Sequence, residues 1–129
     1  MTPSVNLGLN GANDVTYTIT TQGATYPNEA IEASVIVDIV TGFETDLDDF
    51  IVLEPSAPVG ESVYMQAVPS PEAGEGFTVE LRLEHADGAF RHYSYSTTDK
   101  NEVIRMCLDY WGMQKLPDLK VWEDITDQF

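Results

Sequence analysis

The residues between 77 and 96 contain the pattern that most restricts what this chain can fold into. Residues 77–85 alternate apolar and polar side chains, as a strand does when one face lies on the core and the other faces solvent. Asp87 and Gly88 follow this run, and such a pair between two alternating runs indicates a two-residue type I′ turn. Residues 90–96 are then the returning strand of an antiparallel hairpin.

A two-residue turn also predicts the register of this hairpin. With Ala86 opposite Ala89, the expected cross-strand pairs are Glu84 with Arg91, Leu83 with His92, Arg82 with Tyr93, and Glu80 with Tyr95. In this register His92 lies on the apolar face, where a hydrogen-bonded core histidine is a better interpretation than a catalytic base. The solvent face would carry Glu80, Arg82, Glu84, Arg91, Tyr93 and Tyr95.

Three further strands and two helices are predicted along the chain. The strands are expected at residues 15–21, 50–53 and 62–68. Apolar residues from Ile31 to Phe43 recur at helical spacing, although their β-branched content leaves a buried strand over residues 34–41 as the alternative. A second helix begins after Asp99, with Glu102 completing a capping-box-like start, and ends at Gly112.

These elements predict an α+β fold, with an antiparallel sheet of about four to five strands and two helices packed on one face. The 129 residues are expected to form a single domain. Residues 1–14 would be a loose N-terminal lead-in, and residues 115–129 would form a docked C-terminal tail.

A cytoplasmic location is expected from three features of the sequence. No apolar stretch approaches the ~20 residues of a membrane span, and the N-terminus lacks the pattern of a signal peptide. The single cysteine, Cys107, fits a reducing compartment, and its place in an apolar helical pattern predicts a small core residue rather than a reactive thiol.

The charge of the chain is extreme and unevenly distributed. The net charge is -16, and residues 1–81 contain 13 acidic residues and no Lys or Arg, whereas residues 82–129 contain nine acidic and all six basic residues. Self-repulsion of this size weakens the compact state, so solubility, a halophilic source or a basic partner must account for it. Nucleic acid and anionic membranes would be repelled, and neither is expected as a partner.

No combination of residues in the sequence indicates catalysis or a cofactor. The only side chains with a suitable pKa for general base chemistry are His85 and His92, and no nucleophile motif or glycine-rich phosphate loop accompanies them. One Cys and two His do not make a closed zinc site, and Asp46, Asp48 and Asp49 lack the spacing of a calcium-binding loop. The chain is therefore predicted not to be an enzyme and to hold no metal or cofactor.

A partner-binding surface is the better prediction, because Tyr and Arg are frequent among interface hot spots. The strand at 62–68 would extend the solvent face of the hairpin, and the acidic loop before residue 50 would add charge. A packed second face with buried tyrosines is the alternative. The predicted partner-binding residues are Asp46, Asp48, Asp49, Tyr64, Gln66, Glu80, Arg82, Tyr93 and Tyr95.

The order of short motifs resembles that of small bacterial immunity proteins associated with polymorphic toxins, over roughly residues 26–125. The motifs are Phe50-Ile51-Val52-Leu53-Glu54, Tyr64-Met65-Gln66-Ala67, Val79-Glu80-Leu81-Arg82, His92-Tyr93, Glu102-Val103 and Trp122-Glu123. The resemblance implies a cytosolic antidote that neutralises a basic cognate toxin, of nuclease or deaminase type, by direct binding. It transfers no catalytic residue. The alternative is a nucleic-acid-mimicking inhibitor of a DNA-binding protein, encoded by a phage or mobile element, with acidic side chains in rows on helix surfaces.

Overall fold

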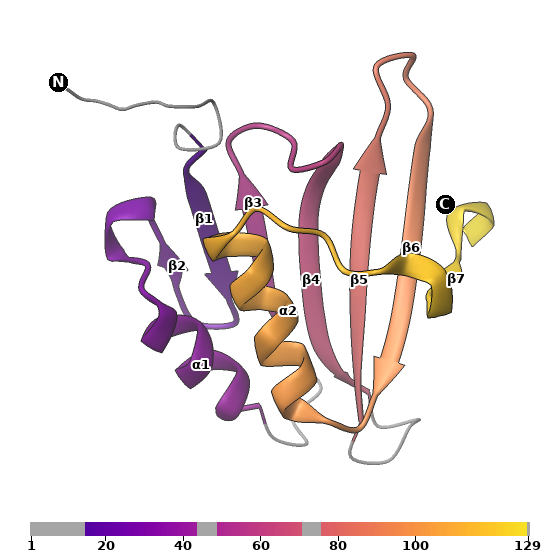
Figure 1. Ribbon diagram of the computed structural model, residues 1–129. Helices are drawn as coiled ribbons and strands as arrows, with labels where there is room; N and C mark the ends of the chain where they lie inside the picture. The colour runs from indigo at the N-terminus through magenta and orange to yellow at the C-terminus, as the bar shows by residue number, and fades with distance from the viewer. Residues whose placement is uncertain (1–14, 44–48, 71–75, 129) are drawn as a thin grey trace, which may run out of the picture.

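The computed structural model describes residues 15–43, 49–70 and 76–128, which form an α+β fold (Figure 1). One antiparallel sheet has the strand order β2-β1-β3-β4-β5-β6-β7. Its strands are β1 (Tyr17–Thr21), β2 (Thr25–Tyr26), β3 (Ile51–Pro55), β4 (Ser62–Ser70), β5 (Gly76–Glu84), β6 (Phe90–Thr97) and β7 (Glu123–Asp124). The two α-helices of the described residues, α1 (Ala33–Thr41) and α2 (Lys100–Gly112), lie together on one face of the sheet.

The prediction of about four to five strands was wrong, because the sheet has seven. The five longer strands coincide with the five that the sequence predicts. The additional strands, β2 and β7, are two residues long and lie at the two edges of the sheet. Two residues cannot show an alternating pattern, so no sequence periodicity marks these edge strands.

Both predicted helices are confirmed. Residues 33–41 form a helix despite their β-branched content, because Ile36 and Val40, four residues apart, are fully buried on one side of it. Helix α2 begins as predicted, with the Asp99 carboxylate accepting a hydrogen bond from the Asn101 amide at 2.9 Å. The prediction for its C-terminus was less accurate, since the left-handed residue is Gln114, at φ 48°, and Gly112 is still helical.

The strands alternate between two differently covered faces. Helices α1 and α2 pack on the face that carries Ile19, Leu53, Met65, Val79 and Leu81, which form the core. No α-helix of the described residues covers the opposite face, which we call the open face. By the strand register, the open face carries Thr18, Thr20, Val52, Glu54, Tyr64, Gln66, Val68, Thr78, Glu80, Arg82, Glu84, Phe90, His92, Ser94, Ser96 and Glu123.

The predicted register of the β5–β6 hairpin was wrong by one residue. Glu84 pairs with Phe90 and Arg82 pairs with His92, instead of with Arg91 and Tyr93. The turn is longer than two residues: the His85 amide donates to the Ala89 carbonyl at 2.8 Å, and the Gly88 amide donates to the His85 carbonyl at 3.0 Å. Gly88, at φ 91°, supplies the left-handed residue of such a three-residue connection.

A slip of one residue moves every side chain of a strand to the other face of the sheet. Tyr93 and Tyr95 therefore lie on the helix-covered side, opposite Leu81 and Val79. His92 lies on the open face, not on the apolar face. The predicted cross-strand pair of Glu84 with Arg91 does not form, and the Glu84 carboxylate lies 3.5 Å from the Arg82 guanidinium instead.

A buried hydrogen-bond network joins helix α2 to the sheet. The Tyr110 side chain is fully buried, and its hydroxyl lies 2.9 Å from the Ser62 hydroxyl. The Tyr17 hydroxyl donates to the backbone carbonyl of Tyr110 at 2.7 Å, and the two rings meet edge to face at 6.0 Å. These contacts tie β1 and β4 to the C-terminal part of α2, and buried polar groups of this kind are costly to leave unsatisfied.

The C-terminal segment lies against the body of the protein. Trp122 is buried and stacks on the Tyr95 ring at 5.4 Å, and the Ile125 amide donates to the His92 carbonyl at 2.8 Å. Gly60 adopts φ 53°, and a Cβ added there would lie 3.0 Å from the Leu116 side chain. Leu116 and Trp122 thus bring the segment after α2 across the helix-covered side to the β6 edge (Figure 1).

Replacing Lys100 by alanine is expected to lower the free energy of unfolding by about 1–2 kcal/mol. The Lys100 ammonium donates to the Thr41 and Phe43 carbonyls, at 3.0 and 3.1 Å, where the last carbonyls of α1 would otherwise lack partners. Urea denaturation measures the change. Arg105→Ala, at an exposed position of the same helix, is the control and should cost less than about 0.5 kcal/mol. Equal losses in the two variants would contradict this role of Lys100.

Candidate functional site

The centre of the open face is a row of polar side chains that crosses four strands. Gln66 on β4 lies opposite Glu80 on β5, which lies opposite Ser94 on β6, and Ser94 pairs with Glu123 on β7. The first three of these side chains are half-buried. The strand pairing fixes the backbones of Gln66, Glu80 and Ser94 next to one another. Their positions are set by the sheet and do not depend on a loop.

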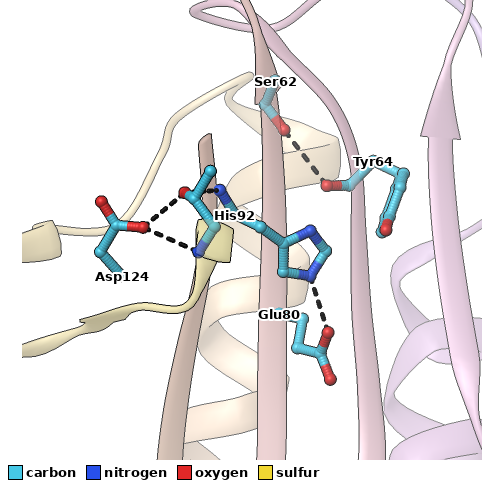
Figure 2. A network of polar contacts seen from close by, with 6 residues as sticks. Ser62, Tyr64, Glu80, His92 and Asp124 are labelled. Carbon is cyan, nitrogen blue, oxygen red and sulfur yellow. Dashed lines mark hydrogen bonds and ion pairs between the residues drawn. The ribbon is translucent and has the colours of Figure 1, made fainter. Parts of the chain in front are cut away.

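Glu80 and His92 form a short polar contact on the open face. The Nε2 atom of His92 lies 2.7 Å from Oε1 of Glu80, and Figure 2 shows the imidazole directed toward the carboxylate. The His92 side chain is only 1% exposed, whereas that of Glu80 keeps 27% of its surface exposed. The buried ring therefore holds a carboxylate that still reaches solvent.

The backbone of His92 is fixed by the C-terminal segment. Its amide donates to the Thr126 hydroxyl at 3.0 Å, and Thr126 also bonds to the Asp124 carboxylate (Figure 2). Hydrogen bonds from Thr126 lower the pKa of Asp124. Asp124 is consequently ionised at neutral pH and acts as a stable acceptor for Thr126.

Tyr64 on β4 also contacts the His92 ring. The two rings meet edge to face, with centroids 6.0 Å apart, and Tyr64 is the cross-strand partner of Arg82. Burial raises the pKa of the Tyr64 phenol, Arg82 lowers it, and the nearby Glu80 and Glu84 raise it again. The phenol is therefore neutral at physiological pH and presents both a hydroxyl and an aromatic ring.

Arg82 packs toward the hairpin turn. Its guanidinium lies 3.9 Å from the centroid of the Phe90 ring, within cation–π range, and 3.5 Å from the Glu84 carboxylate. Among the described residues that the register places on the open face, Arg82 is the only Lys or Arg, and the carboxylates there are Glu54, Glu80, Glu84 and Glu123. The open face is accordingly acidic.

The structure brings together four of the predicted partner-binding residues and places two others, Tyr93 and Tyr95, on the opposite face of the sheet. Tyr64, Gln66, Glu80 and Arg82 are neighbours on β4 and β5 of the open face.

The placement of Tyr93 and Tyr95 on the solvent face was wrong. Both are partly buried on the helix-covered side, where the Tyr95 hydroxyl donates to Glu102 at 2.9 Å. The bond to Glu102 and burial raise the pKa of Tyr95.

Of the three predicted residues of the acidic loop, Asp49 alone belongs to the residues that the structure describes. Asp46 and Asp48 lie outside the described residues, and Asp49 is half-buried just before β3.

Sequence reasoning missed four residues of β6 on the open face, namely Phe90, His92, Ser94 and Ser96. All four were assigned to the wrong face through the hairpin register. The signal that could have found them is the composition of the turn, since Ala86-Asp87-Gly88 suits a three-residue connection with glycine in the left-handed position as well as a two-residue turn.

The thiol of Cys107, on α2, is shielded from solvent. Cys107 is fully buried, as expected for a core residue, and burial raises its thiol pKa to about 12. A thiol with this pKa is a poor nucleophile at neutral pH. Among residues 15–43, 49–70 and 76–128, no three His, Cys, Asp or Glu side chains are grouped so that they could hold a metal ion.

No protein-family model, curated protein or solved structure matches this chain. In the described part of the chain, no helix has both the length and the apolar character needed to cross a membrane.

Proposed function

We propose that this protein is a cytoplasmic, non-enzymatic binding protein that neutralises a basic protein by direct contact, as an immunity protein neutralises a cognate nuclease or deaminase toxin. The observation that carries the proposal is the open face. It presents tyrosine, arginine and carboxylate side chains that the chain's own helices leave uncovered. Such a mixed aromatic and charged surface is typical of the centre and rim of a protein interface.

The net charge supports a basic partner. A charge of -16 destabilises the compact state by self-repulsion, and attraction to a positively charged surface offsets that cost in the complex. Proteins that act on nucleic acid commonly carry basic surfaces, because they must bind phosphates. An acidic inhibitor would associate rapidly with such a target through electrostatic steering.

The α-helices give less support to the nucleic-acid mimic. That alternative needs rows of acidic side chains on helix surfaces. Helix α1 carries Asp38 alone, and the acids Glu102 and Asp109 of α2 alternate with Lys100 and Arg105. The observations therefore favour recognition of a protein through the sheet.

Co-expression tests the proposed function. The protein encoded by the neighbouring gene is expressed alone and together with this chain, and both growth and complex formation are measured. We expect growth arrest by the neighbour alone, rescue by this chain, and a stable complex of the purified pair. Failure of both rescue and complex formation with a toxic neighbour would contradict the proposal.

Two tyrosine variants refine this test. Tyr64→Ala, on the open face, is expected to weaken the complex by about tenfold or more, as truncation of an interface aromatic does. Tyr26→Ala is the matched control, because Tyr26 is also half-buried but lies on edge strand β2, opposite Ile19 on the helix-covered side. It should change affinity less than about twofold. Calorimetry with the purified neighbour measures both values.

A further inference from the structure

We infer that the row formed by Gln66, Glu80 and Ser94 is the receptor for an arginine side chain of the partner, with Glu80 accepting the guanidinium. This inference rests on the proposed function, because it assumes that the partner is a basic protein. It goes further in naming the side chain that the partner inserts and the place on the sheet that receives it.

The first support is the order of the Glu80 carboxylate before any partner binds. The His92 ring is 1% exposed and bonds to Oε1 of Glu80 at 2.7 Å. The backbone of His92 is held in turn by Thr126 and Ile125. A side chain that is already fixed loses little conformational entropy on binding, so more of the interaction with the guanidinium appears as affinity.

The second support is the chemistry of the neighbours. A guanidinium has five N–H donors in a planar fork, whereas an ammonium is a compact group with three donors. A carboxylate flanked by further acceptors therefore suits a guanidinium better than an ammonium. The Gln66 amide and the Ser94 hydroxyl stand directly across from Glu80 on the two adjacent strands. Both groups can accept hydrogen bonds, and the pairing of the strands places them on the same face.

The third support is the surrounding charge. Besides His92, the described residues assigned to the open face include four carboxylates and one arginine, and no lysine. That arginine, Arg82, packs on Phe90 and Glu84 on the turn side of Glu80. The net charge around the row is negative, which complements an incoming cation.

A defined peptide tests the inference without the natural partner. Blocked hexa-arginine (N-acetylated and C-amidated) is titrated into the isotopically labelled protein at low salt, and amide chemical shifts are followed by NMR. We expect saturable shifts centred on Gln66, Glu80 and Ser94, and weaker binding of blocked hexa-lysine by about threefold or more. Shifts centred on α1 or α2 would overturn the inference, and so would equal binding of the two peptides.

Matched carboxylate variants give the second readout. Glu80→Gln is expected to weaken hexa-arginine binding by about tenfold, whereas Glu54→Gln, an equal change of charge at an exposed position of the same face, should weaken it less than about twofold. Equal effects would mean that only net charge matters, which would overturn the site at Glu80. The amide spectrum of each variant reports whether it is folded, and the mapping on the unmodified protein does not depend on either variant.

His92 acts as a positioning residue, and a double-mutant cycle tests this role. His92→Gln should weaken hexa-arginine binding when Glu80 is present but have little further effect in the Glu80→Gln background, because its contribution passes through that carboxylate. Additive effects would overturn the positioning role.

If hexa-arginine does not bind at Glu80 but co-expression still rescues growth, the proposed function stands. The contact surface for the partner would then lie elsewhere on the protein. Failure of both rescue and complex formation with a toxic neighbour would contradict the proposed function itself.

Discussion

Replacing Tyr110 by alanine is expected to lower the free energy of unfolding by about 3–5 kcal/mol, the loss typical of removing a large, fully buried aromatic side chain. The ring is 0% exposed, packs edge to face on Tyr17 and belongs to the core between α2 and the sheet. Its removal leaves a cavity and also leaves the Ser62 hydroxyl without its contact to the Tyr110 hydroxyl. Urea denaturation followed by circular dichroism measures the loss.

Tyr110→Phe is the matched control for this experiment. It keeps the ring but removes the hydroxyl that lies 2.9 Å from Ser62, so it should cost only about 1–2 kcal/mol. If alanine and phenylalanine cost the same, the ring does not fill the core as described. If phenylalanine costs nothing, the hydrogen bond to Ser62 contributes no net stability.

Alkaline pH is expected to produce the second large effect. Burial raises the pKa of Tyr17 to about 12 and raises that of Tyr110 as well. The unfolded chain releases these protons near pH 10, before the folded protein does, so the unfolded state binds fewer protons and stability falls as pH rises. For Tyr17 a shift of about two pKa units corresponds to about 2–3 kcal/mol, present below pH 10 and lost between about pH 10 and 12.

Denaturation curves at several alkaline pH values measure this loss. Tyr17→Phe removes one of several groups whose pKa burial raises, among them Tyr110 and Cys107, so its free energy of unfolding should fall less steeply with pH. The variant starts from a lower stability because the hydrogen bond to the Tyr110 carbonyl is gone. An unchanged slope in this variant would contradict the contribution assigned to Tyr17.

The sequence was sufficient to predict the class of fold, because its longer elements have strong periodicity. The alternation around Val79 and Leu81 identifies a strand, and the acceptor at Asp99 identifies the start of a helix. The segment around Ile36, whose sequence suits either a helix or a strand, is a helix because in this form its apolar residues pack into the core beside α2. Local propensity for β structure was the weaker influence there.

The candidate site could be predicted only in part, because it depends on one residue of register. Tyr64, Gln66, Glu80 and Arg82 were predicted together, since period two within each strand fixes which side chains share a face. Tyr93 was predicted on the solvent face and His92 on the apolar face, and each lies on the other face. The reason is that the length of the turn at Gly88 determines how β6 pairs with β5. The contact between His92 and Glu80 follows from that register and has no signature in the sequence.

The rate of association with the partner, measured against salt concentration, tests the central claim most directly. Stopped-flow mixing of the purified chain with the protein encoded by the neighbouring gene gives the association rate constant. If an acidic protein captures a basic one, that constant should fall by about tenfold or more from low to high salt while dissociation changes less. A rate constant that does not change with salt would contradict recognition of a basic partner.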